Sequence, residues 1–455
     1  MPTDIPAASR SGPLHRPIRG GTRGRVRKDL ALCTIDGTTY SIMVGCGEQY
    51  LPAFVLALGM GQIASGLVAT VPMLAGALLQ LVTPWAVRRL GSYRKWVVLT
   101  AALQGASFLP LVFGALAGMV PGWLVFACAT VYWASGLGGG PAWTTWMSLL
   151  IPVKVRPKYF ARRARYCHIG VMAGLTTGAA VFAAQRDGSI FGGDSGGTLA
   201  AFAVLFGLAF LCRAVSTALL TRQSEPRPLP IRHTAVAPLE LARRMLHGHD
   251  GRLLAYAAAA GVALQFCQPF ITPYFIVGLK LQGFELGVLL AAGFAGRIAL
   301  LGVFGRIAQR LGPLRLLWIG ALGLVPAAAL PLGSDSLAYL CFAQFVSGAS
   351  IAAHELALFL MYLETIREDE RTSLLTLFNV LNSLASVAGS VMGGLVLRAW
   401  GTEGGMTAYV ALFLGGMALR LAALPVLARV RRQGEPVGPA TDIREIGWVV
   451  QREQG

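Results

Sequence analysis

The chain alternates between long apolar runs and short polar segments. A helix needs about 20 predominantly apolar residues to cross the hydrocarbon core of a bilayer. The runs reach this length, so the pattern predicts an all-α integral membrane protein with twelve transmembrane helices. The predicted spans lie at approximately 37–58, 62–87, 94–117, 123–150, 166–185, 199–221, 253–277, 283–307, 313–332, 336–363, 372–397 and 406–428.

The composition excludes an ordinary soluble protein. Of the 455 residues, 55% are hydrophobic and 13% are charged, whereas about a quarter of the residues of a soluble domain are charged. The 56 glycines fit the membrane interpretation, because small residues let membrane helices approach closely. The seven cysteines include no CxxC pair, so the sequence predicts neither a disulfide framework nor a metal site.

The formal net charge of +18 would indicate a nucleic-acid partner in a soluble protein, but here the basic residues gather in the tails and in every second loop. Cytoplasmic loops of membrane proteins carry an excess of Lys and Arg. The distribution therefore predicts cytoplasmic N- and C-termini and no nucleic-acid partner. The basic loops hold Arg88, Arg89, Arg94 and Lys95; Lys154, Arg156, Lys158, Arg162, Arg163 and Arg165; and Arg306, Arg310 and Arg315.

The longest polar break divides the spans into two groups of six. It contains Pro226, Pro228 and Pro230, which block helix formation. The predicted organisation is a disordered basic cytoplasmic tail (1–30), an N-terminal six-helix bundle (31–222), a cytoplasmic central loop (223–252), a C-terminal six-helix bundle (253–430) and a cytoplasmic tail (431–455).

The two groups share short motifs at equivalent places. Arg89-Leu90-Gly91 follows the second span, and Arg310-Leu311-Gly312 follows the eighth. Ser135-Gly136 in the fourth span likewise matches Ser347-Gly348 in the tenth. Such matches predict two homologous halves, as in many transporters that contain internal repeats.

Taken together, these features resemble the major facilitator superfamily, in particular its bacterial members. The family's signature between helices 2 and 3 is a glycine, three residues, an Asp-Arg pair, one residue and a glycine. Here the corresponding segment is Pro84-Trp85-Ala86-Val87-Arg88-Arg89-Leu90-Gly91, in which Pro84 replaces the first glycine and Arg88 the aspartate. The second copy, Gly305 to Gly312, has Gln309 in place of the aspartate.

The resemblance implies two pseudo-symmetric six-helix bundles that rock around a central cavity in the inner (plasma) membrane, in a protein that acts as a monomer. Helices 1, 4, 7 and 10 are expected to line the cavity. The loop positions would form the cytoplasmic gate and loop motif: Arg88, Arg89, Gly91, Arg163, Arg310 and Gly312.

Ionisable residues inside membrane spans are usually functional. Glu48 lies about 18 Å deeper than Asp36 at ~1.5 Å per residue, so it is interpreted either as a protonatable coupling site or as a carboxylate satisfied by a neighbouring helix. Arg297, in the eighth span, would bind an anionic group or pair with a carboxylate. His354 and Glu355, in the tenth span, would form a proton relay or a buried pair. Arg213, in the sixth span, is interpreted as structural and as extending toward the interface.

Uncharged polar and aromatic residues complete the expected cavity lining. Gln265, Gln268 and Thr272 are spaced to share one face of the seventh helix, where they would bind substrate or join helices. Trp143 in the fourth span would form a cavity wall for a flat or apolar substrate, or pack against other helices. Gln49 and Tyr50, beside Glu48, are assigned to the same lining.

No nucleophile elbow, zinc-protease motif or phosphate-binding loop occurs in the sequence, so no enzyme activity, catalytic residue or cofactor is expected. The main hypothesis is a proton-coupled secondary transporter of a small organic solute. The apolar and aromatic character of the first and fourth spans favours efflux. The alternatives are import of a nutrient or organic anion and, because the loop motifs lack their aspartates, a transport-inactive receptor or assembly factor.

Overall fold

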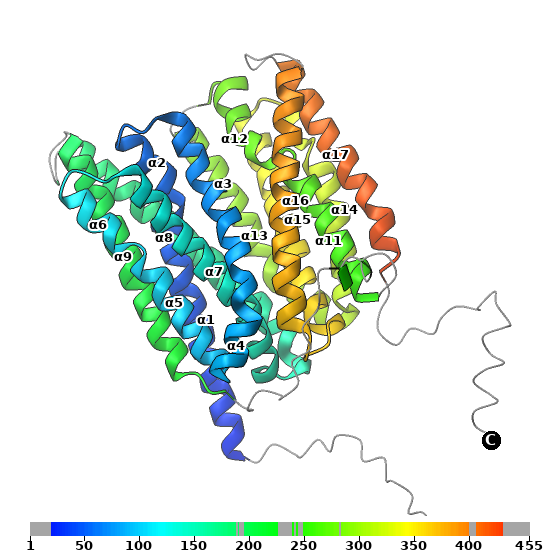
Figure 1. Ribbon diagram of the computed structural model, residues 1–455. Coiled ribbons are helices and arrows are strands. Elements are labelled where there is room, and N and C mark those ends of the chain that lie inside the picture. The colour runs from blue at the N-terminus through cyan, green and yellow to red at the C-terminus, as the bar shows by residue number, and fades with distance from the viewer. Residues whose placement is uncertain are drawn as a thin grey trace, which may run out of the picture.

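The computed structural model describes residues 20–187, 190, 195–225, 239–240, 243, 249–281, 284–399 and 406–430. Within these residues the chain forms helices joined by short turns and contains no strand. The helices stand side by side in one bundle (Figure 1). The start of the first helix and the end of the last one lie toward the same end of this bundle. Ten helical segments within the described ranges are long and apolar enough to cross a membrane. The first and fourth spans complete the twelve.

The N-terminal half forms six spans. Its elements are α1 (Gly20–Cys46), η1 (Glu48–Tyr50) and α2 (Leu51–Ala57); α3 (Gly61–Leu79), η2 (Gln80–Val82) and α4 (Thr83–Leu90); α5 (Tyr93–Ala106) and α6 (Leu109–Leu116); α7 (Gly122–Leu150); η3 (Val153–Val155) and α8 (Arg156–Arg186); and α9 (Ser195–Arg222).

The C-terminal half repeats this arrangement. Its elements are α11 (His249–Gln265), η4 (Gln268–Phe270), α12 (Ile271–Pro273) and the π-helical η5 (Tyr274–Gly278); α13 (Phe284–Leu311); α14 (Pro313–Ala327) and η6 (Leu330–Leu332); α15 (Leu337–Thr365); α16 (Arg371–Ala399); and α17 (Met406–Ala428).

The first helix begins earlier than predicted. It starts at Gly20, so residues 20–30 are helical rather than part of a disordered tail. The carboxylate of Asp29 accepts hydrogen bonds from the backbone N–H of Ser224, at 3.0 Å, and from its hydroxyl. These bonds fix the start of α1 to the chain just beyond α9. Residues 1–19 and most of the central segment 223–252 lie outside the described residues.

The first and seventh spans are interrupted at equivalent places. The α-helical part ends at Cys46 in one and at Gln265 in the other, and a short 3-10 turn follows, Glu48–Tyr50 in the first and Gln268–Phe270 in the second. Pro52 and Pro269, near these breaks, lack the backbone N–H that a continuous helix needs. The shared interruption agrees with the internal repeat.

Close packing between α1 and α8 depends on glycine. A methyl group on Gly170 would stand 2.7 Å from the carbonyl oxygen of Thr38, and one on Gly174 would stand 2.5 Å from that of Ile42. Both neighbours are backbone atoms, which cannot move without separating the helices. The stripe of small residues on α8 is therefore a packing surface, and it places α8 side chains directly against α1.

The two halves meet firmly near the end that carries Gly20 and Ala428, which we call the terminal end. The hydroxyls of Thr145 on α7 and Thr372 on α16 lie 2.9 Å apart, and Arg371 donates to the hydroxyl of Ser148. The rings of Phe160 and Phe359 are 4.6 Å apart between centroids. These contacts hold the two halves together at the terminal end.

Replacing Gly174 with alanine should lower the thermal stability of the purified protein, because the added methyl group forces α1 and α8 apart at an estimated cost of about 1–3 kcal/mol. The measurement is the unfolding temperature in detergent. Gly207→Ala on α9 is the matched control, since nothing lies within 4 Å of a methyl group there and alanine favours helix by about 1 kcal/mol. Equal unfolding temperatures for the two variants would contradict this account of the packing.

Candidate functional site

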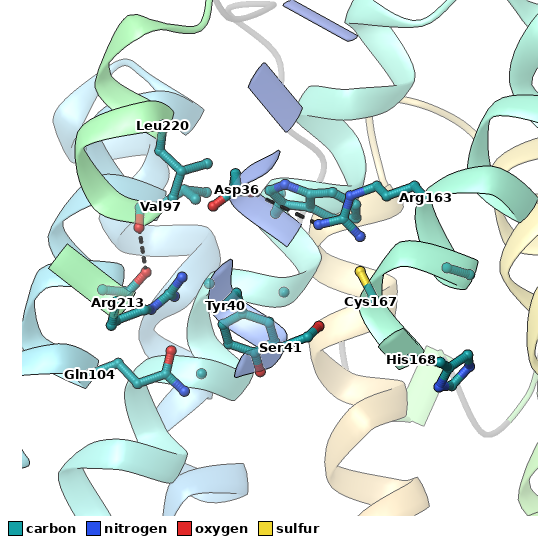
Figure 2. A pocket seen from close by; sticks show the side chains of 16 residues that line it. Asp36, Tyr40, Ser41, Val97, Gln104, Arg163, Cys167, His168, Arg213 and Leu220 are labelled. Atoms are coloured by element: carbon teal, nitrogen blue, oxygen red, sulfur yellow. Dashed lines mark hydrogen bonds and ion pairs between the residues drawn. The ribbon is translucent and has the colours of Figure 1, made fainter. Parts of the chain in front are cut away.

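A cavity of about 410 Å³ lies inside the N-terminal half. Its walls come from α1, α5, α7, α8 and α9, and they combine charged, polar and apolar groups. Figure 2 shows Arg213 and Gln104 on one side of Tyr40, with Arg163, Cys167 and His168 on the other. The lining residues are Asp36, Tyr40, Ser41, Val97, Thr100, Gln104, Gly136, Gly139, Gly140, Trp143, Arg163, Ala164, Cys167, His168, Arg213 and Leu220.

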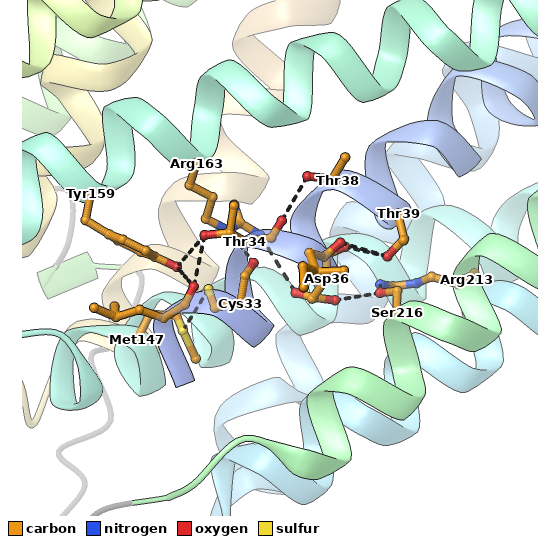
Figure 3. Close-up of polar contacts among 12 residues, drawn as sticks. Cys33, Thr34, Asp36, Thr38, Thr39, Met147, Tyr159, Arg163, Arg213 and Ser216 are labelled. Carbon is orange, nitrogen blue, oxygen red and sulfur yellow. Dashed lines mark hydrogen bonds and ion pairs between the residues drawn. The ribbon is translucent and has the colours of Figure 1, made fainter. Parts of the chain in front are cut away.

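Asp36 on α1 is the central charged group of the cavity. One carboxylate oxygen, Oδ1, accepts a hydrogen bond of 2.6 Å from the Ser216 hydroxyl, which in turn accepts one of 2.7 Å from Nη1 of Arg213. The other oxygen, Oδ2, lies 3.9 Å from Nη2 of Arg163. Figure 3 shows this series of contacts running from α8 through α1 to α9. A single carboxylate thus joins two guanidinium groups.

The position of Arg163 is fixed by neighbours on two other helices, α1 and α7. Its Nε donates to the carbonyl oxygen of Cys33 at 3.1 Å, and its guanidinium carbon lies 4.4 Å from the centre of the Trp143 ring. Gly37 leaves the necessary space, since a methyl group there would stand 2.5 Å from the guanidinium. The guanidinium is therefore oriented by a cation–π contact and a hydrogen bond, and 17% of the Arg163 side chain remains exposed.

Arg213 enters the cavity from α9. Its guanidinium carbon lies 4.7 Å from the centre of the Tyr40 ring, and the residue is 8% exposed. This placement corrects the expectation that Arg213 reaches the membrane interface. The side chain turns inward because Asp36 and Ser216 offer hydrogen-bonding partners there, whereas lipid offers none.

Glu48, the carboxylate that the sequence analysis selected, lies outside this cavity. Its Oε2 accepts a hydrogen bond of 2.6 Å from the Tyr132 hydroxyl, and Nε2 of Gln49 lies 3.4 Å from its Oε1. Glu48 and Gln49 instead line a smaller cavity of about 130 Å³ beside Val68 and Trp133. The neighbouring helix thus satisfies this carboxylate, as one of the two interpretations held.

Tyr50 does not line either cavity. Its hydroxyl donates to the carbonyl oxygen of Leu175 at 2.9 Å, and its ring packs against Gly178 and Phe182. Tyr50 therefore packs the first span against α8 and does not have the cavity role that was expected of it. Trp143, in contrast, does line the main cavity, while Trp146 is fully buried and donates to the carbonyl oxygen of Ser224.

The remaining charged candidates lie in the C-terminal half at two separate places. Nη1 of Arg297 on α13 is 3.5 Å from Oε2 of Glu355 on α15, and the Glu355 side chain is 56% exposed. His354 points into the core of its own half, where its Nε2 lies 3.0 Å from the Tyr256 hydroxyl. The predicted pairing of Arg297 with a carboxylate is seen, but His354 and Glu355 face different surroundings and form no common relay.

The predicted polar face of the seventh helix does not form, because the helix is interrupted after Gln265. Gln268 lies in the 3-10 turn and Thr272 in the short α12, so the spacing of a continuous helix does not apply. The backbone carbonyl of Gln265 accepts a hydrogen bond of 3.5 Å from the Ser390 hydroxyl, which joins α11 to α16.

The loop-motif residues occupy helix ends at the terminal end of the bundle. Arg88 and Arg89 are exposed in the last turn of α4, and Arg310 is exposed in the last turn of α13. Gly91 and Gly312 follow these helices with φ of 59° and 89°, a conformation that glycine adopts readily. Arg163 was assigned to this group wrongly, because it lies inside α8 with its side chain in the cavity.

Four important cavity residues escaped the sequence analysis: Asp36, Tyr40, Gln104 and, as a cavity residue, Arg213. The first span was expected to begin at residue 37, which made Asp36 appear to lie at the membrane surface. Because the helix begins at Gly20, Asp36 lies well inside it, with Tyr40 one turn later on the same side. An earlier start of the first helix was the signal for Asp36 and Tyr40, whereas Gln104 and Arg213 lie inside spans that were predicted.

Comparison with known proteins supports one family. The sequence profile of the Major Facilitator Superfamily matches residues 253–447. A search of curated proteins found no match to the chain.

Solved structures share the fold over most of the chain. The Escherichia coli fucose:proton symporter FucP, in its outward conformation, has a TM-score of 0.69 at 12% identity, covering 88% of this chain and 98% of that chain. The human organic anion transporter TETRAN has a TM-score of 0.67 at 15% identity, covering 90% and 100%. A bacterial homologue of the iron transporter ferroportin, facing outward, has a TM-score of 0.66 at 13% identity, covering 89% and 98%.

The fold is therefore that of a multi-pass membrane transporter. The C-terminal part of the chain matches the Major Facilitator Superfamily profile, and the described residues share the fold of solved transporters of that superfamily.

The two arginines should make the cavity attract anions. In a variant that keeps only Cys167, a water-soluble anionic thiol reagent should react faster than a cationic one. For this comparison, the reaction rate of each reagent with the protein is divided by the rate of the same reagent with free cysteine. Counting His168 as neutral, Arg163 and Arg213 outweigh Asp36 by one positive charge among the lining residues.

The matched control is a variant that keeps only Cys33, which is close to Arg163 but 0% exposed and should react much more slowly with either reagent. A faster normalised reaction of Cys167 with the cationic reagent would show that the cavity is not electropositive.

Proposed function

We propose that this chain is a proton-coupled secondary transporter of a small organic solute, which binds in the cavity of the N-terminal half. The observation that carries the proposal is Asp36, a buried carboxylate that lines this cavity between two arginines. Ionisable groups at membrane depth are costly to bury and commonly mark ion or substrate pathways. The cavity volume of about 410 Å³ falls within the range of small-molecule sites.

A proton at Asp36 would change the interactions of the cavity directly. Its ionised form accepts a hydrogen bond from Ser216 and attracts Arg163, and its neutral form weakens the attraction to the guanidinium. The same group therefore links protonation to the arginines that face the solute. This linkage supports Asp36 rather than Glu48 as the proton site, since Glu48 contacts Tyr132 away from the main cavity.

Alternating access requires the closed terminal end to open. The contacts to be broken there include the hydrogen-bonded pair of Thr145 and Thr372 and the bond from Arg371 to Ser148. Hydrogen bonds of this kind contribute about 0.5–1.5 kcal/mol each, so the closure is reversible. Helices α8 and α13 pack across the halves at Gly305 and Ala161, which gives the halves a surface on which to rock.

The orientation proposed for the chain places both termini in the cytoplasm, in the inner (plasma) membrane, as a monomer surrounded by lipid. Exposed basic side chains at the terminal end support this, including Arg88, Arg89, Lys158 and Arg310. With this orientation the closed side is cytoplasmic. Trp143 in the cavity wall is compatible with efflux of a flat solute, whereas the two arginines favour a solute that carries a negative charge.

Asp36→Asn should abolish accumulation of solute driven by a pH gradient, because asparagine cannot take up the proton. Glu48→Gln should retain it. The measurement is uptake into proteoliposomes from a panel of radiolabelled organic anions, cations and neutral solutes, with the wild-type protein as reference.

Loss of uptake in Glu48→Gln alone would move the proton site to Glu48. The absence of saturable flux for every solute of the panel in the wild-type protein would instead support the transport-inactive receptor.

A further inference from the structure

We propose that the solute is a monovalent organic anion with a flat apolar body, and that its negative group takes the place of Asp36 beside the arginines while Asp36 takes up one proton. This inference rests on the proposed function and adds the substrate class and the charge balance. It is drawn from the loose contact of Arg163, the unsatisfied donor of Arg213 and the shape of the α7 wall.

The ion pair between Asp36 and Arg163 is too long for a direct hydrogen bond. Charge-assisted bonds of this type measure about 2.7–2.9 Å, whereas Nη2 of Arg163 lies 3.9 Å from Oδ2 of Asp36. Part of the Arg163 guanidinium faces the cavity, with its plane held over Trp143. An anionic group of a solute can therefore approach this guanidinium without first breaking a strong bond.

Arg213 offers a second donor to the same anion. Its Nη1 is used by Ser216, but its Nε is buried and has no hydrogen-bond partner among the described residues. The residue is 8% exposed and lines the cavity. A buried donor without a partner is unfavourable, and a rotation of the Arg213 side chain toward a bound acceptor would satisfy it.

The charge of the cavity stays constant if anion and proton bind together. With Asp36 ionised and His168 neutral, the lining residues carry a net charge of +1. Protonation of Asp36 would raise this charge, and the bound monoanion would return it to the same value. Because charge is costly at membrane depth, the empty and the loaded protein would cross between conformations with equal ease. Anion and proton would then move in the same direction with no net charge transferred.

The apolar part of the solute is accommodated on α7. Gly140 and Trp143 are three residues apart and therefore lie on one side of the helix, and both line the cavity. A methyl group on Gly140 would meet nothing within 4 Å, so the space over the backbone is open. An open glycine surface beside an indole ring suits a flat body.

The probe for this proposal is 2-naphthalenesulfonate, which stays anionic at neutral pH. Binding to the purified full-length protein is measured by isothermal titration calorimetry, with naphthalene-2-sulfonamide and 2-naphthylmethylammonium as neutral and cationic counterparts. The sulfonate should bind roughly tenfold or more tightly than either counterpart, as expected for hydrogen bonds to a charged group. Repeating the titration in buffers of different ionisation enthalpy should show uptake of about one proton per anion, by linkage to Asp36.

Variants separate the individual roles. Asp36→Asn should bind the sulfonate more tightly and without proton uptake, because the competing carboxylate is gone, while Arg213→Gln should bind it roughly tenfold or more weakly. Gly140→Leu should block binding by filling the cavity, and Gly207→Leu on α9, where the space is also open, should not. Unfolding temperatures verify that each variant is folded.

The proposal is overturned if the sulfonamide binds as tightly as the sulfonate, or if the sulfonate binds without proton uptake by the wild-type protein. Binding is measured separately from transport, so failure of the anion proposal can be distinguished from failure of the proposed transport function. Sulfonate binding without any transport would leave the site intact and refute transport, whereas proton-driven flux of neutral solutes without sulfonate binding would refute only the anion.

Discussion

A buried carboxylate between two arginines is the constraint on which the N-terminal half depends. Asp36 is only 3% exposed on α1, and an isolated charge buried to this extent would be strongly unfavourable. Its compensation requires α8 and α9 to bring Arg163 and Ser216 to within reach. That approach is possible only because Gly170 and Gly174 let the α8 backbone lie against α1. The packing of small residues that brings α8 against α1 therefore also places the charged group of Arg163 beside Asp36.

The two halves share an architecture but differ in their chemistry. Both interrupt their first span with a 3-10 turn after the α-helical segment. In the N-terminal half the buried charges surround an open cavity. In the C-terminal half Arg420 donates to the carbonyl oxygen of Leu324 at 2.8 Å, and His354 contacts Tyr256, so both side chains join helices of the same half. The fold is thus duplicated, whereas the charged cavity that we propose as the solute site is built in one copy.

Much of the fold could be predicted from the sequence, because apolar length and loop charge are strong, additive signals in a membrane protein. The site could not be predicted to the same extent. Which residues share a cavity depends on where a helix starts and where it is interrupted. The observed boundaries at Gly20, Arg156 and Gln265 differ from the expected ones. Hydropathy does not register a helix that continues into water, so the depth of Asp36 was misjudged. Trp143 could be predicted as a cavity residue because its place in the fourth span did not depend on any of these boundaries.

Although the loop motifs lack their aspartates, other residues supply polar contacts at the terminal end. Where Arg88 replaces the first aspartate, Glu225 accepts hydrogen bonds from the Ser92 hydroxyl at 2.6 Å and from the backbone N–H of Tyr93 at 2.8 Å, and so caps the start of α5. At the second half, Arg371 donates to the carbonyl oxygens of Leu363 and Ile366, which end α15. An acidic residue beyond α9 and a basic residue at the start of α16 thus satisfy the helix ends. The absence of the motif aspartates is therefore accompanied by other polar contacts at this end, and by itself gives no reason to assign the chain to a transport-inactive class.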